Sequence, residues 1–109
     1  MIKIEKPWGY ALIWAHTDDY VGKLLHINKG HRLSKQYHQI KEETIYVLQG
    51  VLHNYDGDDN ITKIKPGENF HIRPHQIHRF AADDGDVELM EVSTPHLDDV
   101  IRLEDDYSR

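Results

Sequence analysis

Four side chains in the sequence are of types that bind metal ions: Gln36, His38 and Glu43, which lie close together, and His78 further along the chain. Gln36 and His38 are two residues apart, so on an extended strand their side chains project from the same face. Glu43 follows across a short turn, and His78 begins an extended segment after the Pro-containing turn at 73–77. An amide oxygen, two imidazoles and a carboxylate leave positions open for water or substrate. The pattern predicts a catalytic metal site rather than a closed structural one.

One divalent metal ion fits this donor set. We expect zinc, with manganese, iron and nickel as alternatives, because mixed oxygen and nitrogen ligands suit all of these ions. Taken alone, each of Gln36, His38 and Glu43 is better explained as a surface residue, since short motifs often match by chance. Their joint spacing is what favours a metal site.

Short strands are the elements that must position these groups, because β-branched and aromatic residues alternate with polar ones along the chain. We expect strands at 10–14, 22–27, 33–38, 43–49, 51–55, 61–64, 69–72, 78–82 and 87–93. Gly, Pro and Asp-Gly turn signals separate them. Many short strands at regular spacing predict an all-β sandwich or barrel, whose closure removes exposed sheet edges.

The length of 109 residues predicts a single domain over 1–109, with an opening strand in 1–10. The acidic tail at 95–109 is expected to dock on the barrel and to contain one helical turn. The 13 basic and 19 acidic residues give a net charge of −6, which argues against nucleic acid or an anionic membrane as a partner.

The absence of cysteine excludes disulfides, thiolate zinc sites and cysteine nucleophiles. No apolar run approaches the length of a signal-peptide core or a membrane span, so we expect a cytoplasmic protein. We also expect a homodimer, because a barrel this small has Trp and Tyr residues beyond those its core needs, and these could bury a strand edge against a second copy.

The spacing of the metal-binding residues resembles the two consensus motifs of the cupin superfamily. Gln36 stands where the first motif usually has His, a variant of the phosphomannose isomerases. Three further segments resemble the type II phosphomannose isomerase domain: 6–10 (KPWGY), 33–38 (LSKQYH) and 100–109 (VIRLEDDYSR). The resemblance covers nearly the whole chain.

This resemblance implies a double-stranded β-helix, the jelly-roll barrel of cupins, with metal ligands Gln36, His38, Glu43 and His78. It also implies interconversion of mannose 6-phosphate and fructose 6-phosphate. The metal would act as a Lewis acid while a base moves one proton between adjacent carbons. Candidates for that catalytic base are His71, His75, Lys41 and Glu91.

The expected partner is therefore a small molecule, a phosphorylated sugar. Arg73 and Lys41 are basic residues near the ligands that could hold its phosphate, because cationic side chains match phosphate oxygens. Alternation along the strands turns Lys35 and Arg79 away from the site.

Two other functions remain open. His38, Glu43 and His78 alone form a two-His-one-carboxylate triad, which with iron can activate oxygen in a dioxygenase. The isomerase branch usually carries two further imidazoles after His38, whereas this chain has Gln39 and Ile40. Their loss favours a non-catalytic sugar-binding barrel, because one fold hosts many activities.

Overall fold

The structure is a computed structural model that describes residues 1–107. These residues form strands and no helix, so none of them belongs to a helix that could cross a membrane. In chain order the strands are β1 (Ile2–Lys6), β2 (Gly9–His16), β3 (Val21–Ile27), β4 (Lys35–Tyr37), β5 (Glu43–Gln49), β6 (Leu52–Tyr55), β7 (Ile61–Ile64), β8 (Asn69–Ile72), β9 (Arg79–Ala81), β10 (Val87–Ser93) and β11 (Ile101–Glu104).

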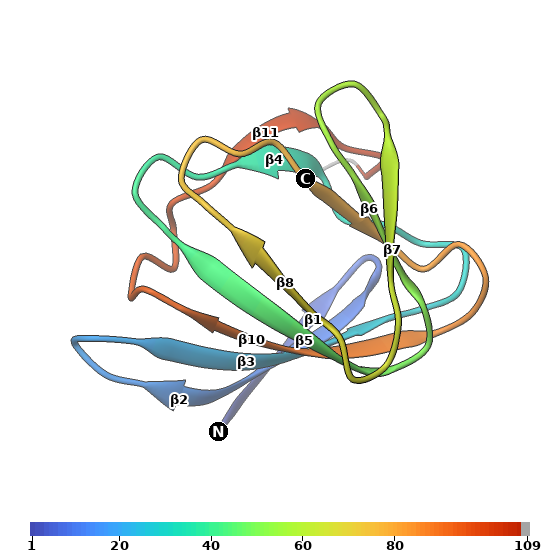
Figure 1. The fold of residues 1–109 in the computed structure, drawn as a ribbon. Helices are drawn as coiled ribbons and strands as arrows, with labels where there is room; N and C mark the ends of the chain where they lie inside the picture. The colour runs from blue at the N-terminus through green and yellow to red at the C-terminus, as the bar shows by residue number, and fades with distance from the viewer. Residues whose placement is uncertain (108–109) are drawn as a thin grey trace.

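All named strand pairs are antiparallel and form three sheets. The largest has the order β1-β2-β3-β10-β5-β8, and the two smaller ones are β7-β6-β9 and β11-β4. Figure 1 shows β3 and β10 along one side of the barrel, with β4 and β11 across the opposite side. A backbone bridge between Gln36 and His78 connects the β4 segment to the start of β9. The prediction of an all-β fold is confirmed.

The hydrophobic core fills the barrel from the inward faces of β3, β5 and β10, closed by β6 and β9. Its fully buried side chains include Ile27, Ile45, Val47, Leu52, Phe80, Val87 and Leu89. Further along the same strands the inward positions become charged, at Lys23, Glu43 and Glu91. The alternation that builds the core therefore also carries polar side chains into one end of the barrel.

The beginning of the chain differs from the prediction of one opening strand in 1–10. Residues 2–16 form a hairpin in which β1 pairs with β2. Gly9, at the start of β2, has φ +152°, and an added Cβ would lie 1.9 Å from the His26 carbonyl oxygen. Only glycine allows β2 to approach β3 this closely.

The expected helical turn in the tail 95–109 is wrong for the part that the structure describes. β11 is a strand instead, and it pairs with β4 through Ile101 opposite Tyr37 and Arg102 opposite Gln36. Pairing satisfies backbone groups of both strands, which an isolated helical turn would leave to water. Residues 108 and 109 lie outside the described part of the chain.

Candidate metal centre

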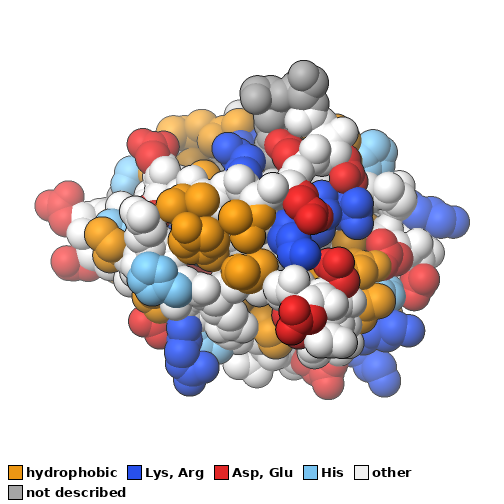
Figure 2. Space-filling model, turned by 90° about the horizontal axis from the view of Figure 1, so that it is seen from above, with side chains coloured by type: hydrophobic (Ala, Val, Ile, Leu, Met, Phe, Trp, Pro, Cys, Tyr) orange, Lys and Arg blue, Asp and Glu red, His pale blue; other side chains and the backbone are white. Residues whose placement is uncertain are grey.

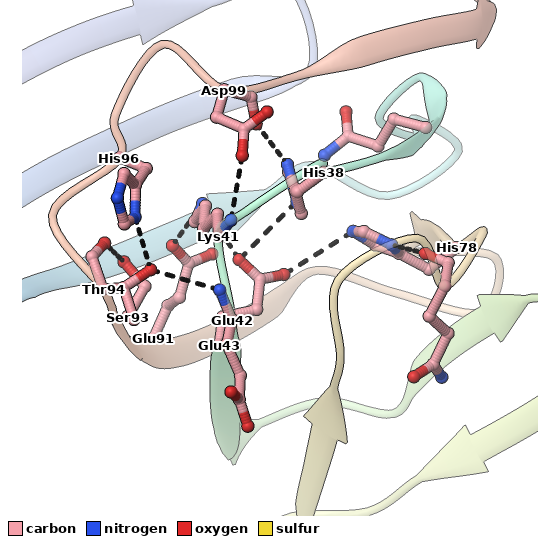
Figure 3. A network of polar contacts seen from close by, with 12 residues as sticks. His38, Lys41, Glu42, Glu43, His78, Glu91, Ser93, Thr94, His96 and Asp99 are labelled. Carbon is pink, nitrogen blue, oxygen red and sulfur yellow. Dashed lines mark hydrogen bonds and ion pairs between the residues drawn. The ribbon is translucent and has the colours of Figure 1, made fainter.

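Three buried side chains meet at the polar end of the barrel. His38 follows β4, Glu43 begins β5, and His78 immediately precedes β9. One nitrogen or oxygen atom from each lies within 4.8 Å of the other two. Glu43 Oε1 is 3.5 Å from His78 Nε2, and Glu43 Oε2 is 3.9 Å from His38 Nε2. Figure 3 shows Glu43 between the two imidazoles.

Both imidazoles are held in the orientation that a metal ligand requires. His38 Nδ1 donates a hydrogen bond to the Asp99 carbonyl, and His78 Nδ1 donates to the Gln76 carbonyl at 3.0 Å. A carbonyl oxygen only accepts, so each Nδ1 carries a proton and Nε2 is left as the coordinating nitrogen of each ring. Backbone carbonyls orient metal-binding histidines in the same way in known metal sites.

The two imidazole nitrogens of the cluster have no hydrogen-bond partner. His38 Nε2 and His78 Nε2 are both buried without one, whereas Glu43 Oε2 contacts the ammonium of Lys41 at 2.9 Å. An unsatisfied buried polar group costs about 1–3 kcal/mol, so two such nitrogens facing one carboxylate are expensive unless a ligand satisfies them. Two imidazoles and a carboxylate are a donor set that fits a divalent transition metal ion.

The charge state of His78 also suits a metal. Burial lowers the pKa of His78 to about 4, because the charged imidazolium is penalised away from water. Hydrogen bonding to Gln76 opposes this shift without reversing it. The ring is therefore neutral near pH 7, and a histidine must be neutral to coordinate a metal ion.

A buried lysine and a second carboxylate lie next to Glu43. Lys41 Nζ is 2.9 Å from Glu43 Oε2 and 3.2 Å from Glu91 Oε2. Burial alone would lower the pKa of Lys41, but the charges of Glu91 and Glu43 outweigh it and raise that pKa. Burial, followed by the charge of Glu43, raises the pKa of Glu91. Lys41 thus stays protonated between two carboxylates.

The loop that carries His38 is fastened by Asp99, in the segment between β10 and β11. Its carboxylate accepts hydrogen bonds from the backbone N–H groups of Gln39, Ile40 and Lys41, at 3.0, 2.7 and 2.8 Å. These three bonds lower the pKa of Asp99 to about 2, so the carboxylate stays ionised. Asp99 therefore holds both the His38 ring and the loop that follows it.

Gln36 lies beside the three-residue cluster. Its backbone exchanges two hydrogen bonds with His78, at 3.0 and 2.9 Å, and its side chain lines the same cavity as His38 and Glu43. Gln36 Oε1 accepts a hydrogen bond from Ser34 Oγ at 2.6 Å. An amide oxygen has two lone pairs, so this bond leaves one for a metal ion. Its role as a fourth ligand stays a prediction.

The four candidate bases separate into two groups. Lys41 and Glu91 line the cavity next to Glu43. His71 is exposed on β8 and contacts Glu42. His75 is exposed in the turn before β9, and its ring packs against Tyr37 at 6.2 Å between centroids. The structure does not bring His71 or His75 into the cavity.

The cavity has a volume of about 120 Å³ and combines apolar walls with basic side chains. Trp8, Leu25, Leu33 and Phe80 form the apolar part, and Lys6, Lys23, Lys41 and Arg102 form the basic part. Arg73 lies outside it, whereas Arg102 was not expected from the sequence. No local pattern predicts this position of Arg102, because it depends on the pairing of β11 with β4.

Residues 23–93 match the cupin domain family. This chain belongs to the cupin family. The match runs from within β3 to the end of β10, and so includes His38, Glu43 and His78 but not Asp99 or Arg102. A search of curated proteins finds no match.

Solved structures share the fold of this cupin. KdgF from Halomonas sp. superposes with a TM-score of 0.77 and 21% identity, over 87% of this chain and 88% of that one. A cupin-like protein from Thermotoga maritima gives 0.76 and 19%, over 91% and 78% of the two chains. A sugar phosphate isomerase of the cupin superfamily from Silicibacter pomeroyi gives 0.69 and 18%, over 78% and 58%. These similarities establish the double-stranded β-helix.

Proposed function

We propose that this cupin is a metal-dependent isomerase of a phosphorylated sugar, with mannose 6-phosphate as the first substrate to test. The observation that carries the proposal is a cavity lined by His38, Glu43 and the buried carboxylate of Glu91, in which the ligand atoms of His38 and Glu43 converge with that of His78. Metal ligands and a base on one cavity wall are the components of a metal-assisted proton transfer. The phosphomannose isomerase motifs and the fold shared with a sugar phosphate isomerase support it.

His38, Glu43 and His78 would hold one divalent ion, with Gln36 as the fourth ligand. Zinc is the first choice, and manganese, iron and nickel are the alternatives. Such an ion supplies Lewis acidity to the carbonyl and the neighbouring hydroxyl oxygen of the substrate. The protein residues must then orient the sugar and move the proton.

We assign the proton transfer to Glu91. When an aldose becomes a ketose, a proton leaves carbon 2 and returns to carbon 1, so one carboxylate can accept it and deliver it. The raised pKa of Glu91 improves its strength as a base near neutral pH. Lys41 Nζ, 3.2 Å from Glu91 Oε2, fixes the position of the carboxylate. The buried side chains of Trp8 and Phe80 line the same cavity, and Glu91 itself is buried from water.

The test is proton NMR of mannose 6-phosphate in deuterium oxide, with protein loaded separately with zinc, manganese and ferrous iron. We expect fructose 6-phosphate to form with deuterium at the transferred position. Incorporation should be incomplete because Glu91 is only 4% exposed and exchanges its proton slowly with solvent. Glu91→Gln should abolish turnover while metal content stays unchanged. Absence of turnover in a sample shown to hold metal would contradict the proposal.

A non-haem iron oxygenase is the second candidate, because the cluster is itself a two-His-one-carboxylate triad. Oxygen consumption by the ferrous protein, dependent on an added substrate, would favour this function over isomerisation. Sugar binding without turnover in any metal form would instead favour a sugar-binding barrel.

Homodimer formation stays a prediction. The outer face of the largest sheet offers exposed apolar side chains for it, at Trp14, Tyr46 and Val92, which are 45%, 48% and 51% exposed. Sedimentation as a monomer at micromolar concentration would contradict a dimer.

A further inference from the structure

Arg102 occupies a position on β11 that faces the candidate metal centre. It lies opposite Gln36 of β4, and Gln36 in turn is bridged to His78. Residues directly opposite each other in an antiparallel pair place their side chains on the same face. Gln36 and Arg102 both line the cavity, so this face is the cavity side of β4 and β11. Arg102 is thus separated from a metal ligand by a single strand.

The guanidinium of Arg102 has no partner within residues 1–107. Two neighbouring arginines differ in this respect, because Arg32 binds Asp106 at 2.6 Å and Arg79 contacts both Glu104 and Asp106. Figure 2 shows the face above β4 and β11, where basic and acidic side chains cluster beside a hydrophobic group. Acidic side chains are therefore near by, yet none of those that the structure describes pairs with Arg102.

The cavity is positively charged although the whole chain carries a net charge of −6. Its lining contains four basic residues and three acidic ones: Lys6, Lys23, Lys41 and Arg102 against Glu43, Glu91 and Asp99. The acidic groups are already engaged, since Asp99 accepts three backbone hydrogen bonds and Lys41 contacts both glutamates. A divalent ion would add further positive charge. Such a site attracts an anion.

We propose that Arg102 binds the negatively charged group of the substrate, a phosphate or a carboxylate, at the mouth of the cavity. A guanidinium forms paired hydrogen bonds with either group. A cavity of about 120 Å³ is small for a whole sugar phosphate, so the reacting end enters it and the anionic group remains beside Arg102. The proposal rests on the proposed function for the place of the reacting end, while anion binding itself requires no turnover.

Isothermal titration calorimetry of the zinc-loaded protein tests this subsite directly. The ligands are mannose 6-phosphate, galacturonate and neutral mannose, which separate a phosphate from a carboxylate and both from the sugar alone. Arg102→Gln should weaken binding of the anionic sugar about 10- to 100-fold, as expected for loss of a charge-assisted pair. Arg73→Gln is the matched control, because it removes the same charge from an exposed arginine outside the cavity. It should change affinity less than about twofold, within the small effect of a distant exposed charge.

Binding of mannose as tight as that of both anionic sugars would overturn the proposal, as would equal losses in the two arginine variants. The Arg102 side chain is exposed and has no partner in the described part of the chain, so Arg102→Gln should fold with an unchanged unfolding midpoint. If anion binding depends on Arg102 but no isomerisation is detected, the anion subsite is supported and the isomerase activity is refuted. Isomerisation with an unchanged KM in Arg102→Gln would support the isomerase and refute the anion-binding role of Arg102.

Discussion

Two clusters of buried polar side chains lie in this barrel, and they differ in how completely their groups are satisfied. Around Arg79, which is 2% exposed, the guanidinium donates to the Leu33 carbonyl at 2.9 Å and contacts Glu104 and Asp106. At the metal centre, by contrast, the buried Nε2 atoms of His38 and His78 have no partner. Desolvation of polar atoms is unfavourable in both clusters, but only around Arg79 do hydrogen bonds and ion pairs within the protein offset it.

This difference separates a structural role from a functional one. The Arg79 cluster fastens the C-terminal segment, whose strand β11 lies against β4. That segment in turn carries Asp99, which orients His38. The Arg79 cluster therefore stabilises the C-terminal segment, and that segment positions a residue of the metal centre.

The largest expected effect is loss of metal in His78→Phe. The phenyl ring keeps the shape of the imidazole but removes the Nε2 ligand, so metal affinity should fall by more than about 100-fold. Stability of the metal-free protein should stay within about 1 kcal/mol, since one hydrogen bond is lost and one unsatisfied atom is removed. Metal content by mass spectrometry and urea unfolding measure both.

His71→Phe is the control for this variant, because His71 is exposed and outside the cavity. It should retain the metal. Full metal content in His78→Phe would contradict a metal-binding role for the cluster of His38, Glu43 and His78.

The second effect concerns pH. In the metal-free protein the pKa of His78 is about 4, against 6.5 in the unfolded chain. Below pH 6.5 the unfolded chain therefore binds a proton that the folded protein does not bind. The stability contribution of the neutral ring is complete above pH 6.5 and is lost as the pH falls through 4, by up to about 3 kcal/mol.

Urea unfolding in the presence of a chelator at several pH values measures this loss. His78→Phe should flatten the decline over the same range. An equal decline in the variant and the original protein would show that other groups carry it.

The third effect should appear in the satisfied cluster. Arg79→Met leaves the Leu33 carbonyl and the Glu104 carboxylate without this donor, while Asp106 keeps Arg32. The change should cost about 2–3 kcal/mol, because the exposed carboxylates can turn to water. Metal affinity of the folded variant should remain nearly unchanged. If Arg79→Met lost metal but kept its stability, the Arg79 cluster would have a functional role rather than a structural one.

The smallest effect is expected for Asp99→Ala, which releases the backbone of residues 39–41 while the Asp99 carbonyl remains. Removing a group that supports a metal ligand typically costs about 10- to 100-fold in metal affinity. Calorimetric titration with zinc measures this loss. Asp98→Ala, a change at the exposed neighbouring residue, should bind zinc as the original protein does.

Much of the fold could be predicted from local sequence alone. The bounds of β5, β7, β8 and β10 agree with the expected strands, because apolar alternation ends at clear turn signals. β4 is shorter than the expected 33–38, and β11 was missed entirely. β4 and β11 form one sheet across a long stretch of chain, and such pairing leaves no local sequence pattern.

The same limit applies to the candidate site. His38, Glu43 and His78 could be identified because each lies in a short motif with fixed spacing. Asp99 and Arg102 could not, since their positions follow from the pairing of β11 with β4. Lys41 and Glu91 were identified only as candidates, and their contact with Glu43 depends on how β5 and β10 lie in the sheet.

The most direct test of the central claim is anomalous diffraction at the zinc edge from crystals grown with zinc. The account predicts one strong peak bonded to His38 Nε2, His78 Nε2 and an oxygen of Glu43, at about 2.0–2.2 Å from each. Zinc peaks at other positions, with none among these three side chains, would contradict it.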